Sequence, residues 1–441
     1  MVAGARLLLR YLSMTLCGNN DMAKSGALAP LKIRDFRYLL AGFAIGQMLM
    51  PLQFITQILW VQHFAPRDIW LIMVALIATS RGLGSLTFGL YGGALADRYD
   101  RRKLLILIQS LQILGTMGIA AMMYLSDGGM AGFALFFGLT FITAGLQAID
   151  GPTRLAIVPD ILGPALTPGG ISLNQVAGQI AMPIAMMFTG LIIDAFGYSG
   201  AYLFSVCGHI IAIICMAMMS YRATPIADSS ADKRYGFSEV ARDVAVGLRY
   251  ARNHPVILWV ILLLVMMMSL GYPATASLGP TWVTTVVGVA IPNMGFIVMF
   301  WGFGSFLGAV AMTQLASYPN RGALMAFGAI LFSLSFVVLV YDHTIMNAII
   351  GNVGLGAGMT ITMVSATILI QQLAPNDIRG RLMSIFQLNM AFAQLMTMPV
   401  AILAQWLTLP VLFPILSFAT LGIVIVILLT QQQLWRSAAK D

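Results

Sequence analysis

The sequence predicts an all-α polytopic membrane protein whose twelve transmembrane helices form two halves of six. Composition is the first observation, because 59% of the 441 residues are hydrophobic and only 9% are charged. A soluble domain carries about 25% charged residues. Second, the chain contains twelve apolar runs long enough for a spanning helix, which needs about 20 apolar residues. Third, one long polar interruption, residues 222–255, divides these runs into six plus six.

The spans are expected in order along the chain with short polar connections between them. They are predicted near 37–61, 69–95, 103–125, 131–158, 171–195, 199–221, 256–280, 291–315, 321–341, 345–372, 380–406 and 409–431. This gives a cytoplasmic segment 1–36, a six-helix bundle 37–221, a cytoplasmic linker 222–255, a second bundle 256–431 and a tail 432–441.

The first 36 residues are not expected to span the membrane. Their apolar run, 7–16, is too short, and Arg10 interrupts it. Three interpretations stay open: an amphipathic segment on the surface, an upstream start with Met22 as the working start, or a cleaved signal peptide. In the linker, Val240, Val244, Leu248 and Ala251 have helical spacing, which predicts a short helix on the membrane surface.

The basic residues indicate the orientation. Of the 24 Lys and Arg residues, 22 fall on one predicted side of the membrane. This bias predicts that both termini lie in the cytoplasm. The net charge of +8 is therefore attributed to orientation and contact with anionic lipid rather than to nucleic acid. The three Cys and four His residues show no paired spacing, so no metal and no cofactor are predicted.

The densest cluster of charge lies between the second and third spans. Within seven positions the chain carries Asp97, Arg98, Asp100, Arg101, Arg102 and Lys103, preceded by Gly92 and Gly93. A short charged hairpin between two spanning helices belongs at a membrane surface, because charge is costly in the hydrocarbon core. A second loop, residues 374–384, carries Ala-Pro-Asn-Asp-Ile-Arg-Gly-Arg-Leu-Met-Ser.

These two loops resemble the signatures of the major facilitator superfamily of transporters. The second loop, together with residues 30–37 and 247–255, is similar to the efflux branch that includes the enterobactin and macrolide exporters. The resemblance implies a secondary transporter with alternating access in a bacterial inner membrane, a cavity between helices 1, 4, 7 and 10, and proton coupling. One departure concerns direction: the Gly-Pro step expected in helix 5 of antiporters is here Met182-Pro183.

The resemblance also implies a conformational latch at the cytoplasmic side. In the family, the first acidic residue of the loop faces the start of helix 11, and the Arg four residues later bridges it to an acidic residue of helix 4. Here these positions are Asp97, Arg101 and Asp150. The gating residues expected in full are Gly93, Asp97, Arg98, Arg101, Arg102, Asp150, Arg154, Asp377, Arg379 and Arg381. The alternative is that the loop charges only anchor the loop and set the topology.

Ionisable residues within spans are functional candidates, because they are costly in a bilayer. Arg81 lies well inside the second span, and Asp150 and Arg154 share a face of the fourth span, four residues apart. Asp150 and Arg81 are the predicted coupling residues. Arg81 could instead snorkel to the outer surface or hydrogen-bond carbonyl groups, and Asp150 with Arg154 could be a purely structural ion pair.

Uncharged polar residues are the predicted substrate route. They are Gln47, Gln53, Gln57, Gln147, Asn352, Gln387 and Asn389. Hydrogen bonding between helices is the competing explanation for each of them. Because the spans near 37–61 and 380–406 carry few charges away from their ends, substrates are expected to be neutral or cationic amphiphiles rather than polyanions.

The predicted function is proton-coupled export of an amphipathic small molecule by a monomer in contact with the lipid bilayer. No catalytic residue is predicted, and the chain has no phosphate-binding loop of an ATPase. The alternatives are an ion-coupled importer of a small solute and a non-transporting membrane receptor on the same fold.

Overall fold

The computed structural model describes residues 28–125, 129–221, 237–315 and 318–436 of the chain. Within these ranges, the side chains of 90–98, 237–244, 376, 377, 379, 380, 384, 387 and 436 lie outside the described part. The interpretations of residues 1–27 and 222–236 therefore concern residues outside it.

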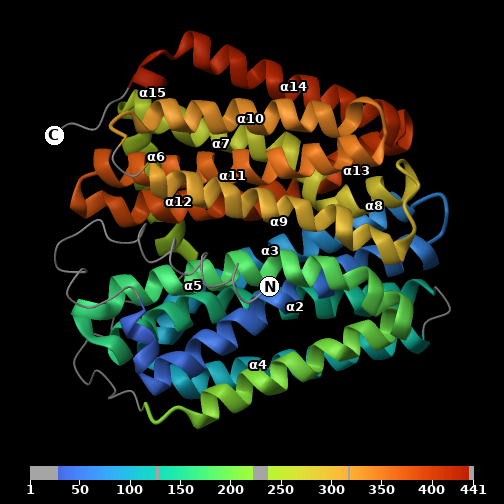
Figure 1. Ribbon diagram of the computed structural model, residues 1–441, viewed down its shortest axis with the longest axis horizontal. Coiled ribbons are helices and arrows are strands. Elements are labelled where there is room, and N and C mark those ends of the chain that lie inside the picture. Colours follow the sequence, from blue (N-terminus) through green and yellow to red (C-terminus); the bar gives the residue numbers. More distant parts are fainter. Residues whose placement is uncertain (1–27, 126–128, 222–236, 316–317, 437–441) are drawn as a thin grey trace, which may run out of the picture.

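The first half is built from α2 to α5 (Figure 1). A short 3₁₀ turn, η1 (Ala29–Lys32), leads into α2 (Arg34–Phe64), followed by α3 (Trp70–Arg98), α4 (Arg101–Leu125) and α5 (Met130–Met218). Helix α5 has 89 residues and leaves helical geometry at Gly163 (φ 69°) and Gly197 (φ 67°). Glycine adopts positive φ without steric cost, so these two residues divide α5 into three spans, 130–162, 164–196 and 198–218.

The second half follows α6 (Phe237–Asn253), a helix at the position predicted for the surface helix of the linker. Its first span consists of α7 (Pro255–Tyr272), the π-helical turn η2 (Pro273–Ser277) and α8 (Gly279–Thr285). The rest comprises α9 (Ile291–Gln314), α10 (Arg321–Tyr341), α11 (Ile345–Leu373), α12 (Asn376–Leu395), α13 (Thr397–Leu407), α14 (Leu409–Thr430) and α15 (Gln433–Arg436). Helices α12 and α13 form one span.

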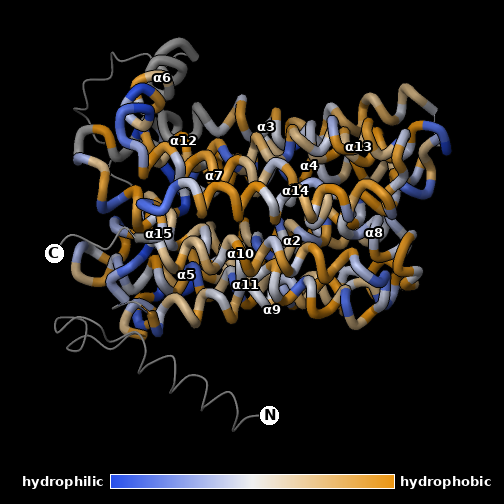
Figure 2. Tube along the Cα trace, turned by 90° about the horizontal axis from the view of Figure 1, so that it is seen from above, coloured by the Kyte–Doolittle hydropathy of each residue, from blue (hydrophilic) through white to orange (hydrophobic). Residues whose placement is uncertain are grey.

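The predicted fold class is confirmed. Among the described residues, ten helical segments are long and apolar enough to cross a membrane, and α5 is counted there as one segment. Because α5 divides into three spans, the described chain has twelve spans. Figure 2 shows hydrophobic residues along the spans and hydrophilic residues concentrated towards the ends of the helices.

We name the two ends of the bundle by their residues. The basic end carries Arg34, Arg101, Lys103, Arg252, Arg321 and Arg381, at the starts of α2, α4 and α10, within α12 and at the end of α6. The opposite end carries the turns 65–69, 286–290 and 342–344. In Figure 1 the first half lies below and the second half above, with α5 and α3 facing α9 and α12 across the boundary.

Glycines allow the helices to pack closely. A Cβ atom at Gly295 would lie 2.5 Å from the carbonyl oxygen of Met186, and one at Gly302 would lie 2.5 Å from Pro183. Both contacts join α9 to the 164–196 span, so they hold the two halves together. Within the second half, Gly308 and Gly358 have similar close contacts with Ala357 and Phe332. These glycines therefore mark close helix contacts.

Candidate functional site

A polar cavity of about 310 Å³ lies within the first half, facing the second half. Its polar lining comes from α2, α3, α4, the 130–162 and 198–218 spans of α5, and α12. These residues are Gln47, Gln53, Arg81, Ser85, Gln109, Gln112, Thr143, Gln147, Asp150, Arg154, His209 and Gln394. A cavity of this size is within the range of small-molecule sites.

Asp150 contacts side chains of two helices, its own helix α5 and α4. Its Oδ2 atom pairs with Arg154 Nε at 2.5 Å, and its Oδ1 atom accepts a hydrogen bond from Gln109 Nε2 at 2.9 Å. The pair has the spacing of one helical turn. Arg154 is 2% exposed, and neither of its Nη atoms has a hydrogen-bond partner among the described residues. The predicted ion pair is therefore present and lines a cavity.

His209 continues this network towards α2. Gln109 uses its Nε2 atom to donate to Asp150, so its Oε1 atom is the acceptor that faces His209 Nδ1 at 2.7 Å. His209 Nδ1 therefore carries a proton, and the neutral ring has a free lone pair on Nε2. Gln53 Nε2 lies 3.2 Å from this Nε2 atom and donates to it, and it also donates to Ser205 Oγ at 3.0 Å.

These contacts form a chain from Arg154 through Asp150, Gln109 and His209 to Gln53. We call it the histidine network. A proton added to His209 Nε2 would face the Gln53 amide donor instead of an acceptor. Gln53 must then turn its amide, so the protonation state of His209 is coupled to a side chain on α2.

Arg81 lies on another wall of the polar cavity, at mid-depth in α3. Its side chain is 6% exposed, its Nη2 atom donates to Gln147 Oε1 at 3.3 Å, and its guanidinium lies 5.2 Å from the centre of the Phe54 ring. No ion pair of Arg81 occurs among the described residues. The snorkelling alternative is wrong, because the side chain is buried against Phe54 and Gln147.

The remaining polar candidates lie in different places. Gln47, Gln53 and Gln147 line the polar cavity. Gln57 instead joins helices, since its Nε2 atom donates to Thr140 Oγ1 and to Tyr202 Oη, at 3.2 and 3.0 Å. Asn389 is 5% exposed, and its amide atoms have no partner among the described residues.

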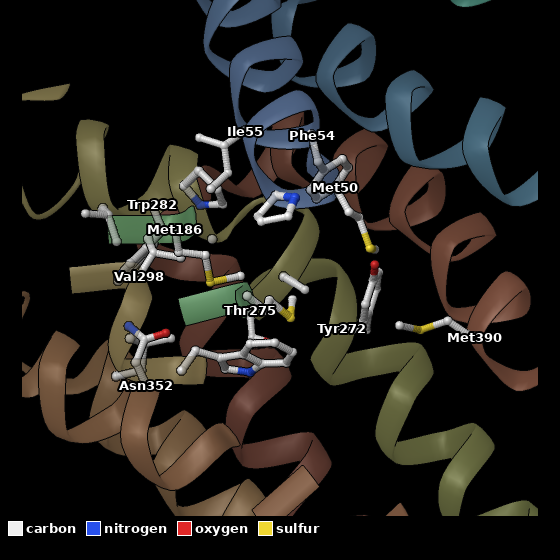
Figure 3. A pocket seen from close by; sticks show the side chains of 18 residues that line it. Met50, Phe54, Ile55, Met186, Tyr272, Thr275, Trp282, Val298, Asn352 and Met390 are labelled. Atoms are coloured by element: carbon white, nitrogen blue, oxygen red, sulfur yellow. The ribbon is translucent and has the colours of Figure 1, made fainter. Parts of the chain in front are cut away.

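A second, apolar cavity lies between the halves (Figure 3). Its volume is about 90 Å³, and α2, the 164–196 span, η2, α8, α9 and α11 contribute to its walls. The lining is aromatic and methionine-rich: Met50, Phe54, Met182, Met186, Tyr272, Trp282, Trp301 and Met390. Figure 3 shows Met50, Tyr272 and Met390 on one side and Asn352 on the other. Asn352 and Thr275 are the polar side chains here other than Tyr272 and the two indoles.

The two cavities are neighbours along α2. Met50 lines both of them, and Phe54, which lines the apolar cavity, contacts Arg81 of the polar cavity. Hydrogen bonds join the halves at the opposite end: Gln62 Nε2 donates to Thr284 Oγ1 at 3.3 Å, and Gln405 Nε2 donates to the carbonyl of Asp68 at 2.8 Å.

A charged cluster joins the helix ends at the basic end. Arg101 Nη1 pairs with Asp160 Oδ2 at 2.7 Å, and the Tyr221 hydroxyl donates to the same Asp160 atom. Arg102 donates to the carbonyls of Met216 and Ala217, and Asp35 accepts from the backbone N–H groups of Ser220 and Tyr221. Burial, followed by the hydrogen bond to Asp160, raises the pKa of the Tyr221 hydroxyl.

This cluster corrects one predicted contact of the latch. The acidic partner of Arg101 is Asp160, not Asp150, which is occupied by Arg154 and Gln109. Ten residues separate Asp150 from Asp160, about 15 Å along a helix. Arg101 starts α4 at the basic end and therefore reaches the nearer carboxylate. The side chains of Gly93, Asp97, Arg98, Asp377, Arg379 and Gln387 lie outside the described residues, so their predicted roles stay predictions.

Sequence reasoning missed His209, Gln109 and Asp160. His209 stood alone, with no second histidine at metal-ligand spacing. The sequence does show Gln109 and Gln112 three residues apart on the third span, so they share a helix face and form a short polar stripe. Their partners are 41 and 100 residues away for Gln109 and 31 away for Gln112, so local spacing could not show them.

Two six-helix halves, with a polar cavity in the first half that faces the second and an apolar cavity between the halves, define a polytopic membrane protein of the transporter class. Comparison with known protein families identifies which family of transporters this is: residues 39–398 match the Major Facilitator Superfamily. The chain belongs to this superfamily, and it is a transporter rather than an enzyme.

Known proteins similar to this chain are transporters too. It is 20% identical over 342 residues to the staphyloferrin A transporter of Staphylococcus aureus, covering 77% of this chain and 83% of that protein. It is 26% identical over 101 residues to a hexose transporter of Saccharomyces cerevisiae, which covers 23% of this chain and 18% of that protein.

Solved structures share the fold at low sequence identity. A crystal structure of the nucleoside transporter NupG has a TM-score of 0.70 at 11% identity, covering 92% of this chain and 99% of that chain. A POT family transporter in complex with 5-aminolevulinic acid has a TM-score of 0.70 at 14% identity, covering 91% and 96%.

Proposed function

We propose that this protein is a proton-coupled secondary transporter that exports an amphipathic small molecule by alternating access. Its setting is a bacterial plasma membrane with both termini in the cytoplasm, where it acts as a monomer. The observation that carries proton coupling is the histidine network. It holds a carboxylate and an imidazole in one hydrogen-bonded chain that borders a cavity.

The network has the chemistry that proton coupling needs. A carboxylate and an imidazole can each take up and release a proton. Asp150 and Arg154 are the charged members of the network, and His209 is connected to them through Gln109. A conformational change that alters the distance of either charge would alter proton affinity. Since Gln53 lies on α2, the same helix that carries Met50 and Phe54, the proton site and the apolar cavity share a wall.

The apolar cavity supports an amphipathic substrate. Methionine side chains adapt to irregular shapes, and aromatic rings contribute large apolar contact area. At about 90 Å³ the cavity is smaller than a drug-sized site. Substrate binding therefore requires it to widen, which movement of one half against the other would provide.

Export is supported by the two loop signatures and by the similarity to a transporter named for a siderophore. One observation favours an importer of a small polar solute as a second candidate: the polar cavity is larger than the apolar one. The direction of transport distinguishes the two candidates.

Accumulation in inverted membrane vesicles tests the proposal. The panel consists of fluorescent dyes, macrolides and aromatic carboxylates, each measured with and without a pH gradient that is acidic inside. We expect accumulation driven by the gradient in the wild type. Asp150→Asn should abolish gradient-driven accumulation and preserve exchange of substrate for substrate, because the variant cannot release a proton at this position.

Asp194→Asn is the matched control, since Asp194 is an exposed carboxylate of α5. It should transport like the wild type. Gradient-driven accumulation that survives in Asp150→Asn would contradict a coupling role for Asp150. Uptake into right-side-out vesicles would favour the importer.

A further inference from the structure

We propose that Arg81 is the binding site for an anionic group of the substrate, whose apolar body occupies the neighbouring apolar cavity. The substrate class is then an amphipathic organic acid with a single anionic group. This inference rests on the proposed transport function and adds the charge of the substrate to it.

The first argument is the missing counter-charge. Arg81 is 6% exposed at mid-depth in α3, and no carboxylate pairs with it among the described residues. Its hydrogen bond within the described part of the chain goes to a neutral amide, that of Gln147. Removing a cation from water costs several kcal/mol unless a partner compensates it. Ionisable groups that are kept inside a membrane protein usually mark a binding or coupling site.

The described side chains that contact Arg81 are neutral. Phe54 of α2 presents its ring face, and Tyr202 and Tyr272 lie close enough for electrostatic interaction with the guanidinium. Gln394 of α12, in the second half, lines the polar cavity together with Arg81. Arg81 is therefore enclosed by groups from both halves, which is the position expected for a substrate group that both halves contact.

Asp150 cannot compensate Arg81. The carboxylate already pairs with Arg154 and accepts from Gln109. Among the charged groups that line the polar cavity, Arg154 and Asp150 cancel, and Arg81 remains. The cavity therefore carries one excess positive charge when His209 is neutral. A monoanion would neutralise it, whereas an amine would add a second unpaired cation.

The apolar cavity supplies the second part of the site. Phe54 joins the two regions, because its ring contacts Arg81 and also lines the apolar cavity with Met50. Figure 3 shows Phe54, Met50 and Tyr272 on the same side of that cavity. A carboxylate on Arg81 thus places an attached apolar or aromatic body among methionines and indoles. This inference departs from the sequence-based expectation of neutral or cationic amphiphiles, which rested on the spans near 37–61 and 380–406 and did not consider Arg81 on α3.

Equilibrium binding to the purified protein in nanodiscs tests the inference. The probes are phenylbutanoate, phenylbutanol and phenylbutylamine, which differ in charge but share their apolar body, with acetate as the anion without a body. Intrinsic fluorescence is a suitable readout, because Trp282 and Trp301 line the apolar cavity. We expect the acid to bind at least about tenfold more tightly than the alcohol or the amine, since charge-assisted hydrogen bonds are the stronger ones.

Arg81→Gln should remove this preference, so that acid and alcohol bind within about threefold of each other. Arg81→Lys keeps the cation and should retain the preference, which separates loss of charge from loss of folding. Arg67→Gln makes the same charge change at an exposed position in the turn 65–69 and should behave like the wild type.

Equal affinity for the three probes would overturn the inference, as would acid preference that persists in Arg81→Gln or no binding of the acid at about 1 mM. No gradient is present in this experiment. Failure of proton coupling in vesicles would therefore leave the binding result intact, and the reverse also holds.

Discussion

The two halves differ in where they keep charge. The spans of the first half contain Arg81, Asp150, Arg154 and His209 deep within the helices. The ranges 256–315, 322–341, 345–373 and 382–430 of the second half contain no Asp, Glu, Lys, Arg or His. Hydrogen bonds that involve charged side chains and His209 join helices of the first half, whereas close glycine contacts occur in both halves, for example at Gly84 and at Gly304.

The difference indicates that the two halves of the fold have different roles. Charge deep in a membrane is costly, so we propose that the half that retains it is the one that responds to protons and anionic ligands. The other half supplies apolar walls and close packing. The cavities follow this division, since the polar one is lined almost entirely by the first half and the apolar one mainly by the second.

The largest effect is expected from Arg154→Gln, which breaks the charge balance of the first half. It would leave Asp150 without a cation in a partly buried site, and removing one partner of a buried pair costs about 3–5 kcal/mol. Thermal unfolding in nanodiscs measures the loss. The double variant Asp150→Asn/Arg154→Gln should recover most of it, and Arg67→Gln is the exposed control. A small loss in Arg154→Gln would show that the pair contributes little.

An intermediate effect is expected from Gly304→Ala in the second half. A Cβ atom at this position would overlap the backbone of Val353 on α11, and overpacking typically costs about 1–3 kcal/mol. Gly422→Ala in α14 is the matched control, because a Cβ atom added at that glycine would have no neighbouring atom within 4 Å. The control should be neutral or slightly stabilising. Equal stability of the two variants would contradict the role assigned to glycine packing.

The smallest effect is expected from Tyr221→Phe at the basic end. The raised pKa of the Tyr221 hydroxyl means that folding favours its neutral form. The stabilisation is fully present below about pH 10, the ordinary pKa of tyrosine, and is lost as the pH rises through the folded-state pKa. Melting temperatures should therefore fall more steeply above about pH 10 in the wild type than in the variant. Parallel profiles would exclude this contribution, which is expected to be under about 1 kcal/mol.

The fold was predictable because periodic properties of the chain determine it. Apolar runs of bilayer length gave most of the spans to within a few residues, for example 37–61 against Arg34–Phe64 and 345–372 against Ile345–Leu373, whereas the fifth span begins at 164 and not at the predicted 171. The turns at Gly163 and Gly197 fall within the predicted connections or at their edges. These features are local, so a single sequence contains them.

The site was predictable only in part. Asp150, Arg154 and Arg81 were found because charge inside an apolar run is conspicuous. His209 and Gln109 were missed because their importance comes from contacts across helices. The partner of Arg101 was misassigned because two acidic residues, Asp150 and Asp160, follow each other on one helix. Only the depth of each residue in the bundle distinguishes them.

The central claim is that protonation of the first half shifts the two halves relative to each other. Electron–electron double resonance between spin labels at Lys103 and Leu373, both exposed towards the basic end, measures this directly after Cys17, Cys207 and Cys215 are replaced by serine. We predict that the distance distribution changes between about pH 4 and about pH 8, a range that brackets the ordinary pKa values of carboxyl and imidazole groups, in the otherwise unmodified protein. The change should be lost in Asp150→Asn/His209→Gln and retained in Asn352→Ala of the second half. A distance distribution that does not change with pH, or that changes equally with pH in all three proteins, would contradict the claim.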